Sequence, residues 1–283
     1  MTQPIVILSF LMCAAMSTDG LNITLLGSGT STGVPVIGCT CPVCRSEHPL
    51  NRRTRCSALI NYQNYNILID TATDLRQQAL REDIRHIDAV FYTHCHADHL
   101  HGIDDLRGFN QHSRGPIPLY GSAQTLKRIE TNFSYIFDPC EPAGYIPNLE
   151  LHPITHAVEL FGLRMIPILL GHGSLPVYGY RCGDFAYLTD CNHIPSASLE
   201  LLADLDILIL DGLRFTPHRT HFNISQAVSM AQRIGARLTL LTHLSHEVDH
   251  PVHDRELPAG ISLAYDGQKF QLDPTFARRE KQP

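Results

Sequence analysis

The stretch Thr93-His94-Cys95-His96-Ala97-Asp98-His99 concentrates three histidines and an aspartate within six residues. The apolar run that leads into it, Ala89–Thr93, has the length and composition of a short buried strand. His94 and His96 stand two residues apart, so an extended backbone points both imidazoles to the same side. The last two residues of the stretch follow where the chain can turn toward a second cation. Because imidazole is the commonest metal ligand, this concentration indicates a metal site.

Three more candidate ligands each follow an apolar run with strand character: His172 after Met165–Leu170, Asp190 after Phe185–Thr189, and His243 after Leu238–Thr242. Taken singly, a histidine or aspartate at a strand end is more often a hydrogen-bonded structural residue. Taken together, these residues complete a ligand set for two cations, and the carboxylate of Asp190 can bridge them. This agreement disfavours a chance histidine cluster on an exposed loop. Cys95 alternates away from its histidine neighbours and is expected to pack rather than bind metal.

The composition is that of an ordinary globular protein, with 283 residues, 43% hydrophobic and 18% charged. A net charge of −6 gives no general attraction to nucleic acid, so a nucleic-acid partner is not expected. Seventeen histidines against 22 lysines and arginines are more than surface chemistry requires. The sequence leaves the oligomeric state open, and a homodimer is one option.

Three of the nine cysteines crowd into Cys39-Thr-Cys41-Pro-Val-Cys44. This spacing favours a metal site and a reducing compartment over a disulfide framework, so a cytoplasmic location is expected. Three thiolates need one more ligand for a closed tetrahedral zinc site, and His246 is the best candidate. The alternatives are three reduced cysteines without metal or an iron–sulfur cluster, which the lack of a fourth nearby cysteine disfavours.

The first twenty residues differ from the rest of the chain. Ile5–Met16 is apolar, but no lysine or arginine precedes it, and it is too short to span a bilayer. We therefore interpret residues 1–20 as an N-terminal extension rather than a signal peptide and expect no membrane association. No linker or internal repeat divides residues 21–283, which we interpret as a single domain.

The periodicity of the chain predicts an α/β protein in which strands cluster and helices come between the groups. The expected strands are Leu21–Leu26, Ser57–Asn61, Asn66–Asp70, Ala89–Thr93, Ile117–Tyr120, Leu163–Leu169, Val177–Arg181, Phe185–Thr189, Ile207–Leu210 and Leu238–Leu241. The expected helices are Thr73–Glu82, Ser122–Glu130, Ser196–Ala203 and Ser225–Ile234. A four-layer αββα sandwich fits this order, although periodicity alone permits other α/β folds.

The motif His-x-His-x-Asp-His, with the three distant ligands, resembles the metallo-β-lactamase superfamily over most of the chain after Gly20. This resemblance implies the αββα sandwich and a dinuclear site of Zn or Mn, with Fe also compatible. One metal would be held by His94, His96 and His172, the other by Asp98, His99 and His243, with Asp190 bridging. Asp70 matches an early strand-end aspartate of the family, and it would accept a proton from a ligand imidazole and fix its tautomer. Two metals would activate a bridging hydroxide and steady charge on the substrate.

The turn Gly27-Ser-Gly-Thr-Ser-Thr-Gly33, the three cysteines and Leu241-Thr-His-Leu-Ser-His246 together resemble the PhnP family of phosphodiesterases. The implied reaction is hydrolysis of a small phosphate ester, such as phosphoribosyl 1,2-cyclic phosphate in phosphonate metabolism. The alternatives are a tRNA-processing ribonuclease of the same superfamily and a non-catalytic cofactor-assembly protein of the pyrroloquinoline quinone type. A ribonuclease would need an extended basic element, which the sequence lacks.

His221, in Arg219-Thr-His-Phe-Asn-Ile, matches a further family histidine just before a helix. With Asp98, it is the expected catalytic residue, donating a proton to the leaving alkoxide or a hydrogen bond to a phosphoryl oxygen. The alternative is a helix-capping or surface histidine. Arg52, Arg53 and Arg55 could bind phosphate, but a solvated charge run is at least as plausible.

Overall fold

The computed structural model describes residues 20–111, 115–138 and 146–272. The apolar run Ile5–Met16 lies outside this part of the chain. The strands form two mixed sheets, with the orders β14-β1-β2-β3-β4-β5-β6 and β13-β12-β11-β10-β9-β8-β7. Among the described residues, no helix has the length and apolar character needed to cross a membrane.

The first sheet contains β1 (Leu21–Gly27), β2 (Ser57–Tyr62), β3 (Tyr65–Ile69), β4 (Ala89–Phe91), β5 (Ile117–Gly121), β6 (Leu149–Pro153) and β14 (Gln268–Leu272). The second contains β7 (Val158–Leu160), β8 (Leu163–His172), β9 (Leu175–Cys182), β10 (Phe185–Leu188), β11 (Ile207–Asp211), β12 (Leu238–Thr242) and β13 (Ile261–Leu263). The helices are α1 (Pro42–Arg45), α2 (Leu75–Arg81), α3 (Ala97–Leu100), α4 (Arg107–Asn110), α5 (Ala123–Asn132), α6 (Ser134–Phe137), α7 (Ser196–Glu200), α8 (Ile224–Ile234) and α9 (His250–His253), with 3-10 turns at Pro49–Asn51, Ile103–Leu106 and Asp254–Glu256.

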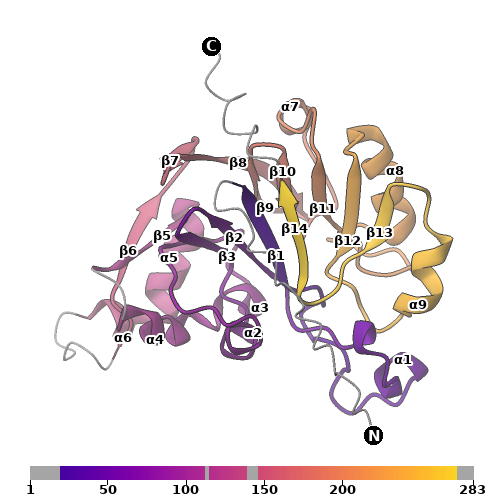
Figure 1. Cartoon of the computed structure of the whole chain (residues 1–283), viewed down its shortest axis with the longest axis horizontal. Helices are drawn as coiled ribbons and strands as arrows, with labels where there is room; N and C mark the ends of the chain where they lie inside the picture. The colour runs from indigo at the N-terminus through magenta and orange to yellow at the C-terminus, as the bar shows by residue number, and fades with distance from the viewer. Residues whose placement is uncertain (1–19, 112–114, 139–145, 273–283) are drawn as a thin grey trace, which may run out of the picture.

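The two sheets pack face to face and carry helices on their outer faces, as Figure 1 shows for α2 to α6 on one side and α8 on the other. Strand β11 illustrates how the sequence builds these layers. Ile207 and Ile209 point into the core between the sheets, whereas Leu208 and Leu210 point to the outer core beneath the helices. Since successive strand residues face opposite sides, a strand covered on both faces must be apolar throughout. The predicted αββα sandwich is confirmed.

All the predicted strands and helices are present, with end shifts of a few residues. The sequence reasoning missed β6, β7, β13 and β14, which are short or rich in polar residues. In Gln268-Lys-Phe-Gln-Leu272, only Phe270 and Leu272 are apolar, yet this segment pairs with β1 along most of its length. The division into an extension of residues 1–20 and one domain from residue 21 stays a prediction.

Candidate metal centre

Parallel pairing gathers the expected ligands at one edge of the sandwich. β3 runs parallel to β4, and β10, β11 and β12 run parallel to one another, so their carboxyl ends meet at shared edges. Asp70, Asp190 and His243 follow β3, β10 and β12, and they adopt left-handed backbone conformations with φ of 61°, 54° and 60°. Such conformations cost about 1–3 kcal/mol each and cluster at functional sites.

One group of potential ligands consists of His94, His96, His172 and Asp190, whose ligand atoms all lie within 4.8 Å of one another. His94 Nε2 lies 2.9 Å from His96 Nδ1, and 3.6 Å from Oδ2 of Asp190. The Nδ1 atom of His172 donates to the carbonyl oxygen of Thr220 at 2.8 Å. That bond leaves Nε2 of His172 with a lone pair for a metal ion.

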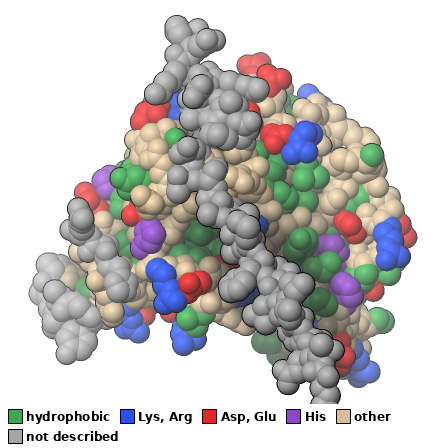
Figure 2. Space-filling view, in the orientation of Figure 1, with side chains coloured by type: hydrophobic (Ala, Val, Ile, Leu, Met, Phe, Trp, Pro, Cys, Tyr) green, Lys and Arg blue, Asp and Glu red, His purple; other side chains and the backbone are tan. Residues whose placement is uncertain are grey.

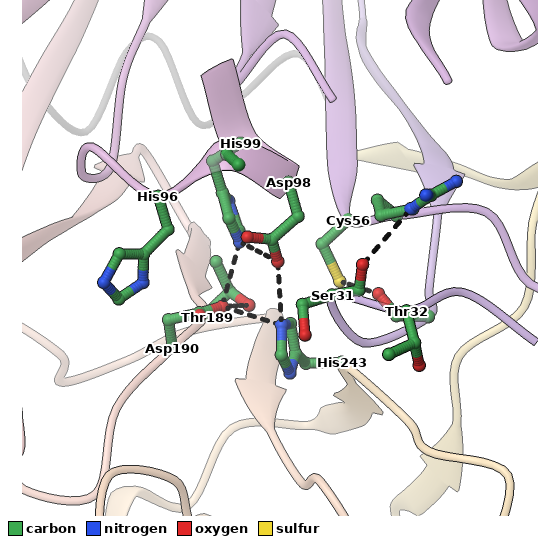
Figure 3. A network of polar contacts seen from close by, with 12 residues as sticks. Ser31, Thr32, Cys56, His96, Asp98, His99, Thr189, Asp190 and His243 are labelled. Carbon is green, nitrogen blue, oxygen red and sulfur yellow. Dashed lines mark hydrogen bonds and ion pairs between the residues drawn. The ribbon is translucent and has the colours of Figure 1, made fainter. Parts of the chain in front are cut away.

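A second group consists of Asp98, His99, Asp190 and His243, and all four residues are buried. Nε2 of His99 and Nε2 of His243 lie 3.2 Å and 3.3 Å from Oδ1 of Asp190. The same two nitrogens lie 3.3 Å and 3.5 Å from Oδ2 of Asp98. Figure 3 shows these side chains converging from separate elements. Asp190 therefore presents one oxygen to each group, as a bridging ligand would.

The orientation of His99 is fixed from behind by Asp70. Nδ1 of His99 donates to Oδ2 of Asp70 at 2.7 Å, and this fully buried carboxylate also accepts bonds from the backbone and hydroxyl of Thr93. When His99 is neutral, this bond keeps its proton on Nδ1 and leaves the lone pair of Nε2 facing the site. The contact between Asp70 and His99 is consistent with the role that the family resemblance implies for Asp70, and that role stays a prediction.

His221 lies beside the two groups. Its Nδ1 atom lies 2.7 Å from Oδ2 of Asp211, and its Nε2 atom lies 4.0 Å from Oδ2 of Asp190. Its ring stacks on that of His243 at a centroid distance of 4.7 Å. His221 is buried, so the structure rules out the surface alternative. The helix cap is Asn223, which forms a capping box with Gln226 at the start of α8.

The charges of the two groups are set by their mutual contacts. Burial lowers the pKa of His99, but the carboxylates of Asp190, Asp98 and Asp70 outweigh it and raise that pKa well above its usual value. Burial alone would raise the pKa of Asp190, but the imidazoles of His243 and His99 hold it well below the usual range. Burial lowers the pKa of His94 well below its usual value. Ionised carboxylates beside imidazoles make a site that favours cations.

The donors fit divalent metal ions. Nε2 of His99 and both ring nitrogens of His243 are buried without a hydrogen-bond partner. A buried polar atom without a partner costs free energy, and an ion bound to Nε2 of His99 and Nε2 of His243 removes that cost at these two atoms. Nitrogen and carboxylate oxygen donors suit Zn, Mn or Fe.

The three cysteines meet His246 at a separate place. The Sγ atoms of Cys39, Cys41 and Cys44 lie 3.2, 3.5 and 3.5 Å from Nδ1 of His246. Tetrahedral zinc with bonds of about 2.3 Å to sulfur and about 2.0 Å to nitrogen would separate these atoms by about 3.5 Å. The backbone N–H of Cys44 lowers the pKa of Cys41 to about 7, whereas burial raises that of Cys44 to about 11. The four side chains fit one zinc ion.

We predict that these four side chains hold a structural zinc, so we expect the Cys41→Ser protein to bind one zinc ion fewer than the wild type and to be less stable. A ligand that binds only the folded state raises the free energy of unfolding by about 2.7 kcal/mol when its free concentration is about 100 times its Kd. For a chain of this size, that corresponds to a fall in Tm of roughly 5–10 °C. Zinc stoichiometry and thermal unfolding measure both effects. Cys95→Ser is the control and should keep the zinc. A Cys41→Ser protein with wild-type zinc content and Tm would rule out the structural zinc.

The four-layer sandwich, with histidines and aspartates gathered at one edge, defines a metal-dependent hydrolase. Residues 65–244 match the beta-lactamase superfamily domain. A crystal structure described as "a New Diphosphatase from the PhnP Family" is 46% identical, with a TM-score of 0.84 over 89% of this chain and 97% of the other. The chain belongs to the PhnP family of the metallo-β-lactamase superfamily. The fold of that superfamily implies divalent metal ions at this edge.

Two curated relatives carry other names. The chain is 39% identical over 254 residues to an octanoyltransferase of Porphyromonas gingivalis, covering 88% of this chain and 51% of the relative. It thus spans about half the length of that protein. Ribonuclease BN of Erwinia tasmaniensis is 26% identical over 254 residues, covering 69% of this chain and 83% of the relative.

Sequence reasoning missed Asp211, a fully buried carboxylate that contacts His221 and accepts a bond from the backbone of Cys191 at 2.7 Å. The signal was present, because Asp211 ends the apolar run Ile207–Leu210 much as Asp70 ends its own strand. Two arginines of the run have structural contacts instead, whereas Arg52 is exposed. Arg53 is buried and donates to the carbonyl oxygens of Ser245 and Val248, and Arg55 pairs with Asp74.

Proposed function

We propose that the protein is a phosphodiesterase that hydrolyses a P–O bond in a small disubstituted phosphate, cyclic or linear. The observation that carries this proposal is the placement of Asp190 between two ligand groups, with the His221–Asp211 pair at their side. A solved relative at 46% identity is described as a diphosphatase, a class that also breaks a P–O bond. Phosphoribosyl 1,2-cyclic phosphate, an intramolecular diester, remains the specific substrate to test first.

Two divalent ions, Zn or Mn, would supply an activated water and neutralise charge on the phosphate. The protein's own residues hold and orient the reacting groups. Asp70 and Thr220 fix the tautomers of His99 and His172 so that each presents a lone pair. Asp98 and Asp190 supply negative charge for the ions. The site is assembled from strand ends of both sheets, which keeps it rigid.

The His221–Asp211 pair would serve the leaving group. When His221 is protonated, Nδ1 donates to the carboxylate of Asp211, and Nε2 points its proton toward the site. Asp211 stabilises the imidazolium, because the two are 2.7 Å apart and buried together. A departing alkoxide placed beside Nε2 would receive that proton.

The substrate class can be tested by assaying the metal-loaded protein against a matched panel. We expect the highest kcat/KM on phosphodiesters, including phosphoribosyl 1,2-cyclic phosphate, and much lower values on phosphomonoesters, a β-lactam and a thioester. Chelation should abolish turnover, and Zn or Mn should restore it. Higher kcat/KM on the lactam or thioester than on any phosphate ester would contradict the proposal.

A ribonuclease is the nearest rival function and would need a basic surface for polynucleotide. On the face shown in Figure 2, lysine and arginine side chains alternate with acidic ones and form no continuous patch. Because the net charge of −6 gives no general attraction to a polynucleotide, we expect a tRNA precursor added to the panel to be a poor substrate. Octanoyl transfer belongs to a relative about twice as long, and the two metal-ligand groups of this chain favour hydrolysis over acyl transfer.

A further inference from the structure

Asn192 lies two residues after the expected bridging aspartate and connects the segments on either side of it. Its Oδ1 atom accepts a bond from the backbone N–H of Gly173 at 2.9 Å, and its Nδ2 atom donates to the carbonyl oxygen of Arg219 at 2.8 Å. Gly173 directly follows the expected ligand His172, and Arg219 precedes His221 by two residues. One partly buried amide therefore joins three segments of the metal centre.

The main chain around this amide pairs with the same two neighbouring segments. The backbone N–H of Asn192 donates to the carbonyl oxygen of Gly171 at 2.9 Å, and the N–H of Gly171 donates to that of His193 at the same distance. On the other side, the backbone N–H of Phe222 donates to the carbonyl oxygen of Cys191 at 2.8 Å. The main chain thus holds this segment between its neighbours, and the side chain of Asn192 adds a further bond to each of them.

The two side-chain bonds require a donor and an acceptor on one short side chain. A backbone N–H can only donate and a carbonyl oxygen can only accept, so the partners fix the orientation of the Asn192 amide. Aspartate has the same shape but lacks the donor, and its carboxylate would face the carbonyl oxygen of Arg219. The arrangement is therefore specific for asparagine.

The segment on one side of the amide supports a ligand and contains the expected proton donor. The carbonyl oxygen of Thr220 accepts the bond from Nδ1 of His172 at 2.8 Å. The rings of His172 and His221 are inclined at 71°, with their centroids 4.6 Å apart. A Cβ atom at Gly173 would lie only 2.8 Å from Cγ2 of Thr220, so the two segments are in close contact. A shift of this segment would move His221 relative to His172 and weaken the bond that orients His172.

We propose that Asn192 is a positioning residue that fixes the place of His221 relative to the ligand group of His172. The part that concerns proton donation rests on the proposed phosphodiesterase function, whereas the part that concerns the ligand does not. Without the amide, the segment gains freedom, the Nδ1 bond of His172 weakens, and Nε2 of His221 loses its fixed place. His99 is oriented by Asp70, on the other sheet, so its bond does not depend on Asn192.

The imidazole N–H protons report on the ligand without any turnover. A proton in a buried hydrogen bond exchanges with water only when that bond opens, so its exchange rate measures local opening. In zinc-loaded protein with ¹⁵N-labelled histidine, the Nδ1–H signals of His172 and His99 are assigned by their loss in the corresponding glutamine variants. We expect the His172 proton to exchange about 10-fold faster in Asn192→Ala, the effect of losing one hydrogen bond, and the His99 proton to keep its rate.

Asn192→Asp tests the donor separately, because it keeps the acceptor for Gly173 but cannot donate to Arg219. We expect it to accelerate exchange of the His172 proton as Asn192→Ala does. Wild-type exchange in Asn192→Asp would exclude the bond to Arg219 as the cause and overturn the inference.

Turnover of two esters reports on the proton donor. We expect Asn192→Ala to lower turnover of the methyl ester of thymidine 5′-phosphate about 10-fold more than that of the p-nitrophenyl ester, because only an alkoxide needs the proton of His221. The matched control is Asn110→Ala, at the end of α4. The Asn110 amide also accepts from a backbone N–H and donates to a carbonyl oxygen, both of Asn148, at 2.8 Å and 3.1 Å. This variant should keep the wild-type signals and the wild-type ratio of turnover.

Unchanged exchange of the His172 proton in Asn192→Ala would overturn the inference. Equal acceleration at His172 and His99 would also overturn it, because that result indicates general loosening of the site, and equal loss on both esters would remove the effect on His221. A protein that hydrolyses no phosphodiester contradicts the proposed function instead, and exchange of the His172 proton in that protein still tests the role of Asn192.

Discussion

The Asp190→Asn protein should fold normally and lose at least about 10³-fold in kcat/KM. Asp190 offers one oxygen to each ligand group, at 3.2 Å from His99 and 3.6 Å from His94. Removing its charge withdraws a shared ligand, and with it several kcal/mol of charge stabilisation, where each 1.36 kcal/mol is tenfold in rate. Steady-state kinetics and metal analysis on the same sample measure the loss and the number of ions retained.

Asparagine is the right replacement because Asp190 has a φ of 54°. Asparagine tolerates this left-handed conformation, whereas alanine would add backbone strain and could unfold the site for another reason. Asp83→Asn is the matched control, since Asp83 has the same φ of 54° in an exposed turn beside Arg85. It should leave kinetics and metal content unchanged. Wild-type turnover with wild-type metal content in Asp190→Asn would remove Asp190 from the bridging position.

The predictable part of the site consists of residues that directly follow apolar strands. Asp70, Asp190 and His243 each end a run whose length and composition indicate a buried strand, and the structure brings all three together. Neighbouring parallel strands have their carboxyl ends at the same edge of a sheet. Residues that directly follow such strands in the sequence therefore lie close together in the structure. The left-handed backbone of these residues had only a weak sequence signal, because none of the three is glycine, although aspartate and histidine adopt this conformation more often than most residues.

Contacts between distant segments were not predictable. Arg53 reads as part of a basic run, but its partners are carbonyl oxygens of Ser245 and Val248, almost two hundred residues away. Asp211 ends an apolar run as Asp70 does, yet nothing local shows that it faces His221. The pairing of β14 with β1 likewise depends on the completed sheet, because a strand of mainly polar residues gains its stability from its neighbour.

The His221→Ala protein should keep both metals and lose about 10²–10⁴-fold in turnover of a diester with an alkoxide leaving group, the usual contribution of a general acid. Nε2 of His221 lies 4.0 Å from Oδ2 of Asp190, which is close enough to reach a leaving group. The ring of His221 stacks on that of the expected metal ligand His243, so His221 itself lies behind the ligands. The methyl and p-nitrophenyl esters of thymidine 5′-phosphate form a matched pair, because they share the phosphoryl group under attack.

A p-nitrophenolate leaves without a proton, so the loss on that ester should be much smaller than on the methyl ester. Asp211→Asn tests proton donation by His221 in a second way. It keeps the imidazole of His221 but removes the carboxylate that lies 2.7 Å from Nδ1. The imidazolium form then loses its partner, and turnover of the methyl ester should fall more than turnover of the p-nitrophenyl ester. Equal losses on both esters in His221→Ala would indicate phosphate binding instead of proton donation. No loss on either would leave His221 with a purely structural role, stacked on His243.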